Sequence, residues 1–226
     1  MDAVSDAPRP RGRPRADDAT TLHTDQLLDA ALEHFAARGF DAASMRELAR
    51  DLGVSHNLIP QRVGNKETLW FAAVDHGFAD LATELSETFG PPSDASTIDA
   101  TPDTDTLRAL VIRFVEANTR RPALARIINQ EAVAPGPRLD HIFTAYIEPV
   151  QRFGEQVLDA LVDRGETSPA SVALFYFLMT HGAAGPAMYP ALAARLGATV
   201  DPDDPEAVRR HATAAADWLF DGLRTR

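Results

Sequence analysis

Cysteine is absent from this chain of 226 residues. Its absence excludes a disulfide scaffold, a thiolate zinc or iron–sulfur site and a cysteine nucleophile. It also fits a reducing compartment, so we expect the protein to be cytoplasmic. Lysine is nearly absent as well, because Lys66 is the only one and every other cationic side chain is an arginine.

Acidic residues outnumber basic residues in the whole chain, but not in every segment of it. The net charge of −11 argues against non-specific binding to nucleic acids. Residues 1–70, however, carry nine Lys and Arg against eleven Asp and Glu, and four of those cations fall between Arg9 and Arg15. The acidic excess therefore belongs mainly to the rest of the chain.

Long hydrophobic runs are missing too. The first twenty residues are polar and interrupted by proline, unlike a signal peptide. Thr167–Ala194 contains no charged side chain other than His181, but its continuous apolar run, Val172–Met179, is far shorter than a membrane span of about 20 residues. We expect a helix buried on all sides there, and no membrane contact.

Apolar residues recur at helical spacing along most of the chain, with no alternating strand pattern. The sequence predicts an all-α protein with a flexible basic arm (1–20), a three-helix head with a helix-turn-helix (21–69) and a larger helical body (70–226). Ser44-Met45-Arg46-Glu47 is a capping box that begins the second helix, Ser55 is a candidate cap for a short third one, and Asn65 caps a fourth that runs from Lys66 to about Phe89.

Motifs of catalysis are missing. The seven histidines are scattered, and no HExxH, GxSxG or GxGxxG run occurs. We therefore expect no enzyme, no catalytic residue, no metal site and no cofactor.

The spacing of Ala49, Gly53 and Ile59 predicts a helix-turn-helix. Two helices that cross steeply need a small residue at their closest approach, and the tight turn between them needs a residue that tolerates a left-handed backbone. On this spacing alone an ordinary helical hairpin remains an alternative to a DNA-binding one.

A longer pattern resembles the DNA-binding head of TetR-family transcriptional regulators. It comprises Phe35, Gly39-Phe40, Ser44, Leu48-Ala49, Gly53-Val54-Ser55, Ile59 and Gly64-Asn65-Lys66-Glu67-x-Leu69. The resemblance covers Thr24 to Leu69 and is only architectural beyond residue 70. It implies a homodimer that binds a double-stranded DNA operator and usually represses transcription.

Three positions depart from the family pattern. Pro60 and Arg62 stand where the family usually has aromatic residues (or His, at the second position), and Val63 stands where Phe is usual. If Ser55 caps the third helix, Pro60 falls beyond its first turn and removes a helical hydrogen bond. Either this helix begins later than Ser55 or it is bent.

The hydrogen-bonding groups in the grooves of DNA predict a role for each candidate DNA-contacting residue of the head. Side chains at the start of a helix that enters the major groove meet base edges, and amides pair with adenine. We expect base contacts from His56, Asn57 and Gln61, phosphate rather than guanine contact from Arg62, and register-setting backbone contacts from Ser44 and Arg46. We expect Ser55 to contact DNA as well, and the resemblance implies a phosphate contact for Lys66.

The arm carries a motif of its own. Pro10-Arg11-Gly12-Arg13-Pro14-Arg15 resembles an AT-hook core, in which two arginines enter a narrow A/T minor groove. We expect Arg11 and Arg13 to bind there; a solvated basic tail is the alternative.

The resemblance also implies a function for the body. The segments matching the family's dimerisation helices are about 168–184 and 205–224. A small-molecule ligand would bind between apolar residues and a few polar groups, although each of these residues could instead be ordinary core. The candidates are Phe114, Ile128, Asn129, Phe143, Tyr146, Phe153, His181, Met188 and Tyr189. The hypothesised response to the ligand is a shift of helix 66–89, which changes the spacing of the two recognition helices.

A different class of function stays open at this point. Pro60 and the acidic balance of the first 70 residues would also suit a helical small-molecule- or partner-binding module that has lost DNA binding.

Overall fold

The computed structural model describes residues 22–89, 103–169 and 171–223, and within these ranges it contains helices and no strand. The all-α expectation is confirmed. The arm with Arg11 and Arg13 lies outside the described residues. The head comprises α1 (Thr24–Ala42), α2 (Met45–Asp51) and α3 (Leu58–Val63), and α4 (Lys66–Phe89) leads out of it.

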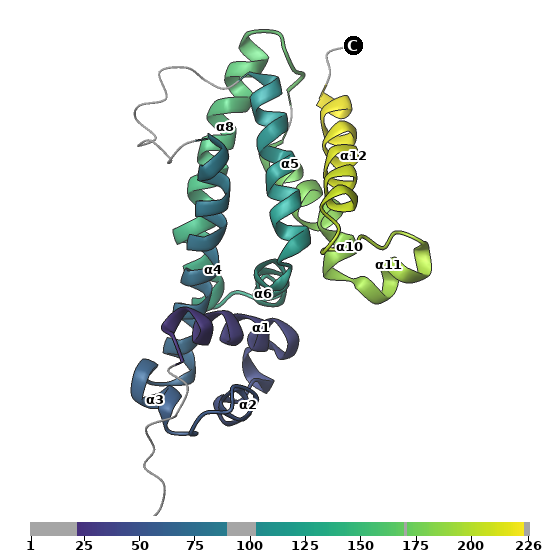
Figure 1. The fold of residues 1–226 in the computed structure, drawn as a ribbon. Helices are drawn as coiled ribbons and strands as arrows, with labels where there is room; N and C mark the ends of the chain where they lie inside the picture. The colour runs from purple at the N-terminus through teal and green to yellow at the C-terminus, as the bar shows by residue number, and fades with distance from the viewer. Residues whose placement is uncertain (1–21, 90–102, 170, 224–226) are drawn as a thin grey trace, which may run out of the picture.

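The body follows after residue 103 and contains two π-helical segments, η1 and η2. Its elements are α5 (Thr104–Arg120), α6 (Ala123–Glu131), α7 (Pro137–Ile142), η1 (Phe143–Ile147), α8 (Glu148–Asp163), α9 (Val172–Phe177), η2 (Leu178–Ala183), α10 (Gly185–Met188), α11 (Pro190–Leu196) and α12 (Pro205–Leu223). Figure 1 shows α4 rising from the head into the body beside α8 and α5, with α12 on the far side of α5.

Two hydrophobic clusters hold these helices together. The first joins the head to the lower body, because Leu27, Phe35 and Ile59 of the head share it with Trp70 of α4 and Ile127 of α6. The second lies higher, between α5, α8, η2 and α12. The core of the head therefore continues into the body through α4 and α6.

Helices α1 and α4 approach closely at Gly77. A Cβ atom at this position would lie 2.9 Å from Leu32 Cδ2, which is too close for van der Waals contact. Glycine costs about 1 kcal/mol of helix propensity in a helix interior. Here its missing side chain lets the head pack directly against α4.

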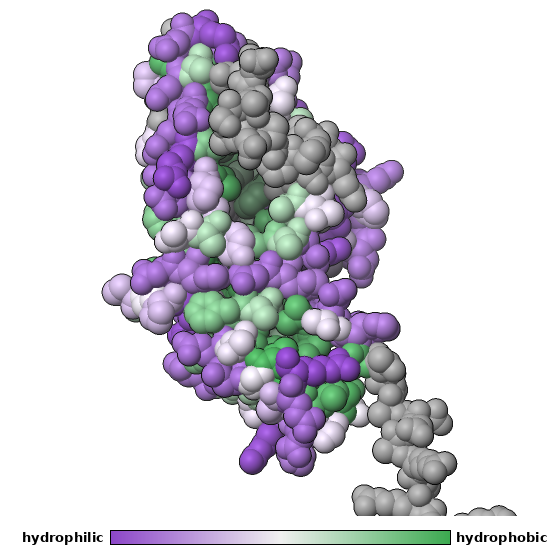
Figure 2. Space-filling view, turned by 90° about the vertical axis from the view of Figure 1, so that its left-hand side faces the viewer, coloured by the Kyte–Doolittle hydropathy of each residue, from purple (hydrophilic) through white to green (hydrophobic). Residues whose placement is uncertain are grey.

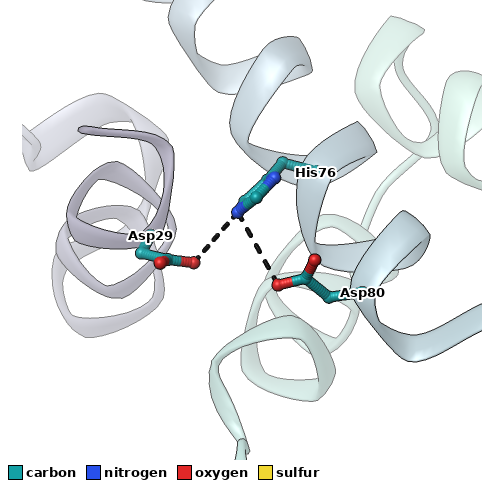
Figure 3. Close-up of side chains that lie close together, drawn as sticks. All are labelled: Asp29, His76 and Asp80. Carbon is teal, nitrogen blue, oxygen red and sulfur yellow. Dashed lines mark hydrogen bonds and ion pairs between the residues drawn. The ribbon is translucent and has the colours of Figure 1, made fainter. Parts of the chain in front are cut away.

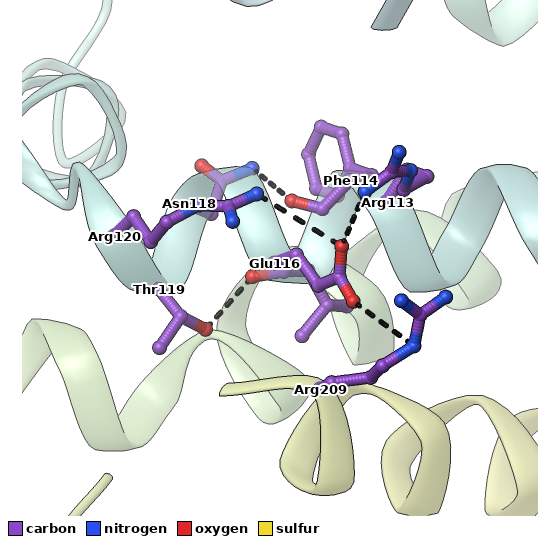
Figure 4. Close-up of polar contacts among 8 residues, drawn as sticks. Arg113, Phe114, Glu116, Asn118, Thr119, Arg120 and Arg209 are labelled. Atoms are coloured by element: carbon purple, nitrogen blue, oxygen red, sulfur yellow. Dashed lines mark hydrogen bonds and ion pairs between the residues drawn. The ribbon is translucent and has the colours of Figure 1, made fainter. Parts of the chain in front are cut away.

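A buried carboxylate connects α5 to α12. The Glu116 side chain is only 4% exposed, and its oxygens lie 3.0 Å from Arg113 Nη1, 3.9 Å from Arg120 Nη2 and 3.9 Å from Arg209 Nε (Figure 4). Arg209 belongs to α12, and the other two arginines belong to α5. Burial of a charge is costly unless it is paired, and these three cations supply that pairing.

The expectation of a helix buried on all sides in residues 167–194 is wrong. The segment is divided into α9, η2, α10 and part of α11, and Leu174, Phe177 and Leu178 are 58%, 57% and 49% exposed. The surrounding helices of one chain cover only part of this apolar surface. None of the described helices is both long and apolar enough to cross a membrane.

Candidate nucleic-acid interface

The start of α2 is fixed by two hydrogen bonds. Ser44 is its N-cap, and the Ser44 hydroxyl accepts the backbone N–H of Glu47 at 3.5 Å. The backbone N–H of Ser44 donates in turn to His34 Nε2 at 3.2 Å. His34 is buried, and its burial, aided by the nearby charge of Arg38, lowers the pKa of the imidazole below 6.5. The uncharged ring is the form that accepts this hydrogen bond.

Gly53 turns the chain between α2 and α3. Its φ of +67° is left-handed, as the spacing predicted. Gly53 N–H donates to Arg50 O at 3.0 Å and Val54 N–H donates to Ala49 O at 2.9 Å. This pair of bonds is the Schellman arrangement, which satisfies carbonyls at the end of a helix. Ala49 is buried beneath the turn, where only a small side chain lets the two helices meet.

The position of Pro60 is explained by the start of α3. The helix begins at Leu58 rather than at Ser55, and its N-cap is Asn57. Ser55 forms the preceding turn, in which its hydroxyl accepts the N–H of Asn57 at 3.5 Å. Pro60 is thus the third helical residue, where the backbone N–H has no helical partner to lose. The sequence left open whether this helix begins later than Ser55 or is bent, and the structure has the later start.

The buried and exposed faces of this hairpin separate clearly. Leu48, Ala49 and Ile59 are at most 3% exposed and fill the angle between the helices. The predicted DNA-contacting residues lie toward solvent: Ser44 and Lys66 are half-buried, and the exposed ones are Arg46, Ser55, His56, Asn57, Gln61 and Arg62. The hairpin therefore presents a polar outer surface on a rigid apolar wedge.

Two cations of this surface have intramolecular partners. A guanidinium N–H of Arg62 donates to the carbonyl of Leu22, at the point where the chain enters the head. Lys66 Nζ donates to Asp41 O at 3.0 Å and lies 4.7 Å from the centroid of the Phe40 ring. Arg62 has further N–H donors that can reach a phosphate, whereas Lys66 would have to share or exchange its carbonyl partner.

None of the nine residues predicted to bind a ligand lines either of the two cavities described below. Asn129 Nδ2 contacts Met188 Sδ at 2.9 Å. Tyr146 stacks on Phe78 and donates its hydroxyl to Asp75 at 2.6 Å, and burial, aided by that carboxylate, raises the pKa of Tyr146. Of the others, Phe114 and Ile128 are partly buried, Phe153 packs in the upper cluster, His181 contacts Thr180, and Phe143 and Tyr189 are exposed.

Two cavities of about 360 and 370 Å³ are lined by other residues. One lies between α1, α4, α5 and α6, and includes Leu32, Leu81, Ala117 and Leu124. The other lies between α8 and α9. Figure 2 shows a hollow with hydrophobic surface on the side of the body where α4 and α8 lie, above a belt of hydrophilic side chains.

Several connections between head and body could not be read from local sequence patterns. Gln130 of α6 donates to Ala36 O of α1 at 2.8 Å. Arg138 of α7 lies 4.0 Å from the ring centroid of Phe40. The two residues of each pair are about a hundred positions apart in the chain, and no short sequence motif predicts such contacts.

Comparison with known proteins identifies the type of the helix-turn-helix. Residues 27–73, which include α2, the turn at Gly53 and α3, match the family model for "Bacterial regulatory proteins, tetR family". The head of this chain is therefore similar to the DNA-binding domain of tetR-family proteins. No curated protein matches the chain. The helix-turn-helix is a DNA-binding element of the tetR type, and the protein is a DNA-binding transcriptional regulator.

Solved structures share the fold over most of the chain. KstR2 of Mycobacterium tuberculosis, a ketosteroid transcriptional regulator, is 18% identical with a TM-score of 0.66, over 89% of this chain and 94% of that one. A tetR-family regulatory protein from Rhodococcus RHA1 is 20% identical with a TM-score of 0.63, over 88% and 96%. FadR from Bacillus subtilis, in complex with stearoyl-CoA, is 15% identical with a TM-score of 0.58, over 88% and 98%. At these identities the likeness describes the fold, from the helix-turn-helix head to the helical body, and it does not favour a module without DNA binding.

Proposed function

We propose that this protein is a homodimeric repressor of the tetR type that binds a pseudo-palindromic operator and is released by a small molecule bound in its body. The observation that carries the proposal is the α2–α3 hairpin: its apolar wedge is buried and its predicted DNA-contacting residues face outward. Two such hairpins related by two-fold symmetry would read two half-sites.

Within the hairpin, His56, Asn57 and Gln61 would contact base edges. Ser44, Arg46, Ser55, Arg62 and Lys66 would hold the phosphate backbone, and Arg11 and Arg13 of the arm would contact the minor groove. Contacts to phosphates set affinity, and contacts to base edges set sequence preference. The two groups should therefore respond differently to mutation.

The dimer would form through the apolar surface of α9, η2 and α12. This surface exposes Leu174, Phe177, Leu178 and Trp218, whose exposed fractions range from 49% to 83%. Monomeric proteins rarely leave a large contiguous apolar patch in water. A partner subunit would cover these side chains and bring two heads to one face of the DNA.

The ligand would be apolar or amphiphilic. The hydrophobic hollow of the body supports this class (Figure 2), as do the ketosteroid regulator and the stearoyl-CoA complex among the structures that share the fold. The residues predicted from the sequence to bind it fall partly in the two π-helical segments, which are frequent at functional sites: Phe143 and Tyr146 in η1, and His181 in η2.

The test is equilibrium binding to the DNA upstream of the protein's own coding sequence, measured by fluorescence anisotropy at several salt concentrations. Arg62→Ala and Lys66→Ala should each weaken binding to every duplex and lower the salt slope by about one. Asn57→Ala should change the preferred sequence. Arg152→Ala, an exposed arginine on α8, is the matched control and should leave the slope unchanged. A slope that is the same in all four variants would contradict the assigned interface.

Stearoyl-CoA and a ketosteroid are the first molecules to add to the preformed complex. Release of the DNA by either would support an apolar ligand. A complex that survives these and other lipid-like molecules, but dissociates with a small hydrophilic metabolite, would contradict the proposed ligand class.

A further inference from the structure

A histidine lies between two carboxylates where the head meets α4. His76 Nε2 of α4 is 3.1 Å from Asp29 Oδ1 of α1 and 3.6 Å from Asp80 Oδ2 of α4 (Figure 3). Within the described residues, these three make the one group of His, Cys, Asp or Glu whose ligand atoms all lie within 4.8 Å of one another. The DNA-binding and dimerisation roles proposed above do not involve them.

The three atoms are suited to a transition-metal ion. Zinc binds imidazole nitrogen and carboxylate oxygen at about 2.0–2.2 Å, so ligand atoms around a tetrahedral ion lie about 3.4 Å apart. The two measured distances bracket that value. Two carboxylates and a neutral imidazole also carry the charge that balances a divalent cation. Calcium and magnesium prefer oxygen ligands, so the nitrogen favours the zinc class.

Two helices offer ligands at helical spacing. His76 and Asp80 are four residues apart on α4, which places them on one face. Asp29 and Glu33 are four apart on α1, and both line the 360 Å³ cavity together with Asp80. Glu33 thus adds a further carboxylate to the lining of this cavity. The cavity is open to solvent, and the Asp29 side chain is 63% exposed, so an ion can enter.

One neighbouring cation opposes binding. Arg121 Nη1 lies 3.6 Å from Asp80 Oδ2, but its side chain is 70% exposed and can turn into solvent. With Glu33 included, the groups that face the cavity still carry net negative charge.

We propose that Asp29, His76 and Asp80 bind one divalent transition-metal ion of the zinc class. The ion joins α1 of the head to α4, close to the point where Gly77 lets these helices touch. Its consequence for DNA affinity rests on the proposed function, because α4 is the helix whose shift would move the recognition helix. Binding of the ion does not depend on DNA.

The competing explanation is a plain ion pair between a protonated histidine and two aspartates. His141 provides a matched control for it, because its Nε2 contacts a single carboxylate, Asp75, at 2.6 Å. An ion pair can form with one carboxylate or with two, whereas the proposed metal site needs both Asp29 and Asp80.

The experiment uses the full chain without a polyhistidine tag, stripped with a chelator and titrated with Zn²⁺ against a chromophoric competitor. We expect one ion per chain. His76→Gln and Asp29→Asn should each weaken binding at least about tenfold, by analogy with the loss seen when even outer partners of a metal site are removed. His141→Gln should bind as the wild type does. Equal affinity in His76→Gln, or failure of the wild type to retain zinc at micromolar concentration, would overturn the proposal.

A second measurement tests whether the ion joins the two helices. Zinc should raise the thermal midpoint of the wild type, because a ligand that binds only the folded state stabilises it. Asp29→Asn keeps both ligands of α4 and removes the one from α1. An equal rise of the midpoint in this variant would overturn the interhelical site.

Discussion

His34 is a buried residue that supports the start of the DNA-binding hairpin. It accepts the N–H of Ser44, which caps α2. An N–H that is fully buried without a partner costs about 1–3 kcal/mol, and this part-buried bond lies toward the lower end of that range. The ring therefore contributes to the geometry of α2 as well as to its stability. Because burial lowers the pKa of His34, its hydrogen bond also depends on pH.

The stability of the head should therefore fall in mild acid. The folded-state pKa of His34 lies below the unfolded value of 6.5, so the unfolded chain takes up a proton first. The stabilisation is complete above that value and decreases as the pH falls below it. His34→Gln keeps an acceptor but does not titrate, so its unfolding free energy should change less between pH 7.5 and 5.5, as measured by urea denaturation. Identical pH dependence in both proteins would contradict this role.

At the scale of the helix, α3 illustrates how a proline is accommodated. Because α3 begins at Leu58, Pro60 lies within its first turn. Pro60→Ala should then change the unfolding free energy by less than about 1 kcal/mol, since no helical hydrogen bond is restored. A helix beginning at Ser55 would instead gain about 3 kcal/mol from the same change. Urea denaturation distinguishes the two values, and the larger one would contradict the observed start.

The pairing of α5 with α12 depends on the charge of Glu116. Glu116→Gln keeps the shape but removes the charge that three arginines share, and should destabilise the protein by about 1–2 kcal/mol. The expected loss of stability is modest because the arginine side chains are 36–68% exposed and can be solvated. Glu206→Gln, on the partner helix α12 and 89% exposed, is the matched control and should change stability by less than about 0.5 kcal/mol. Equal effects of the two changes would contradict the role of the buried carboxylate.

Elements with local start and stop patterns were predictable from the sequence. The caps at Ser44 and Asn65 and the turn at Gly53 depend on residues only a few positions apart, and the structure has all three. The role of His34 and the approach of Asp29 to His76 depend on contacts between elements, so no spacing pattern reveals them. Apolar residues of the body were ambiguous for another reason: a core, a dimer interface and a ligand cavity all use the same side chains.

At the scale of the whole molecule, the account requires two chains. Trp218 of α12 is 83% exposed in a single chain. Trp218→Glu should yield a monomer by light scattering and should lose operator affinity, because each half-site is then bound separately. Val133→Glu is the control: Val133 is equally exposed at 84% but follows α6, away from α9 and α12. A dimer that persists in Trp218→Glu, or one that is lost in Val133→Glu, would contradict the proposed interface.

Selection of bound duplexes from a random pool tests the central claim most directly. If the hairpins of two subunits read DNA together, the purified protein should enrich an inverted repeat whose half-sites are about one helical turn apart or a multiple of it. Light scattering of the enriched complex should then give an even number of chains on each duplex. A pool that shows no enriched sequence, with no salt-sensitive complex at low ionic strength, would contradict the account.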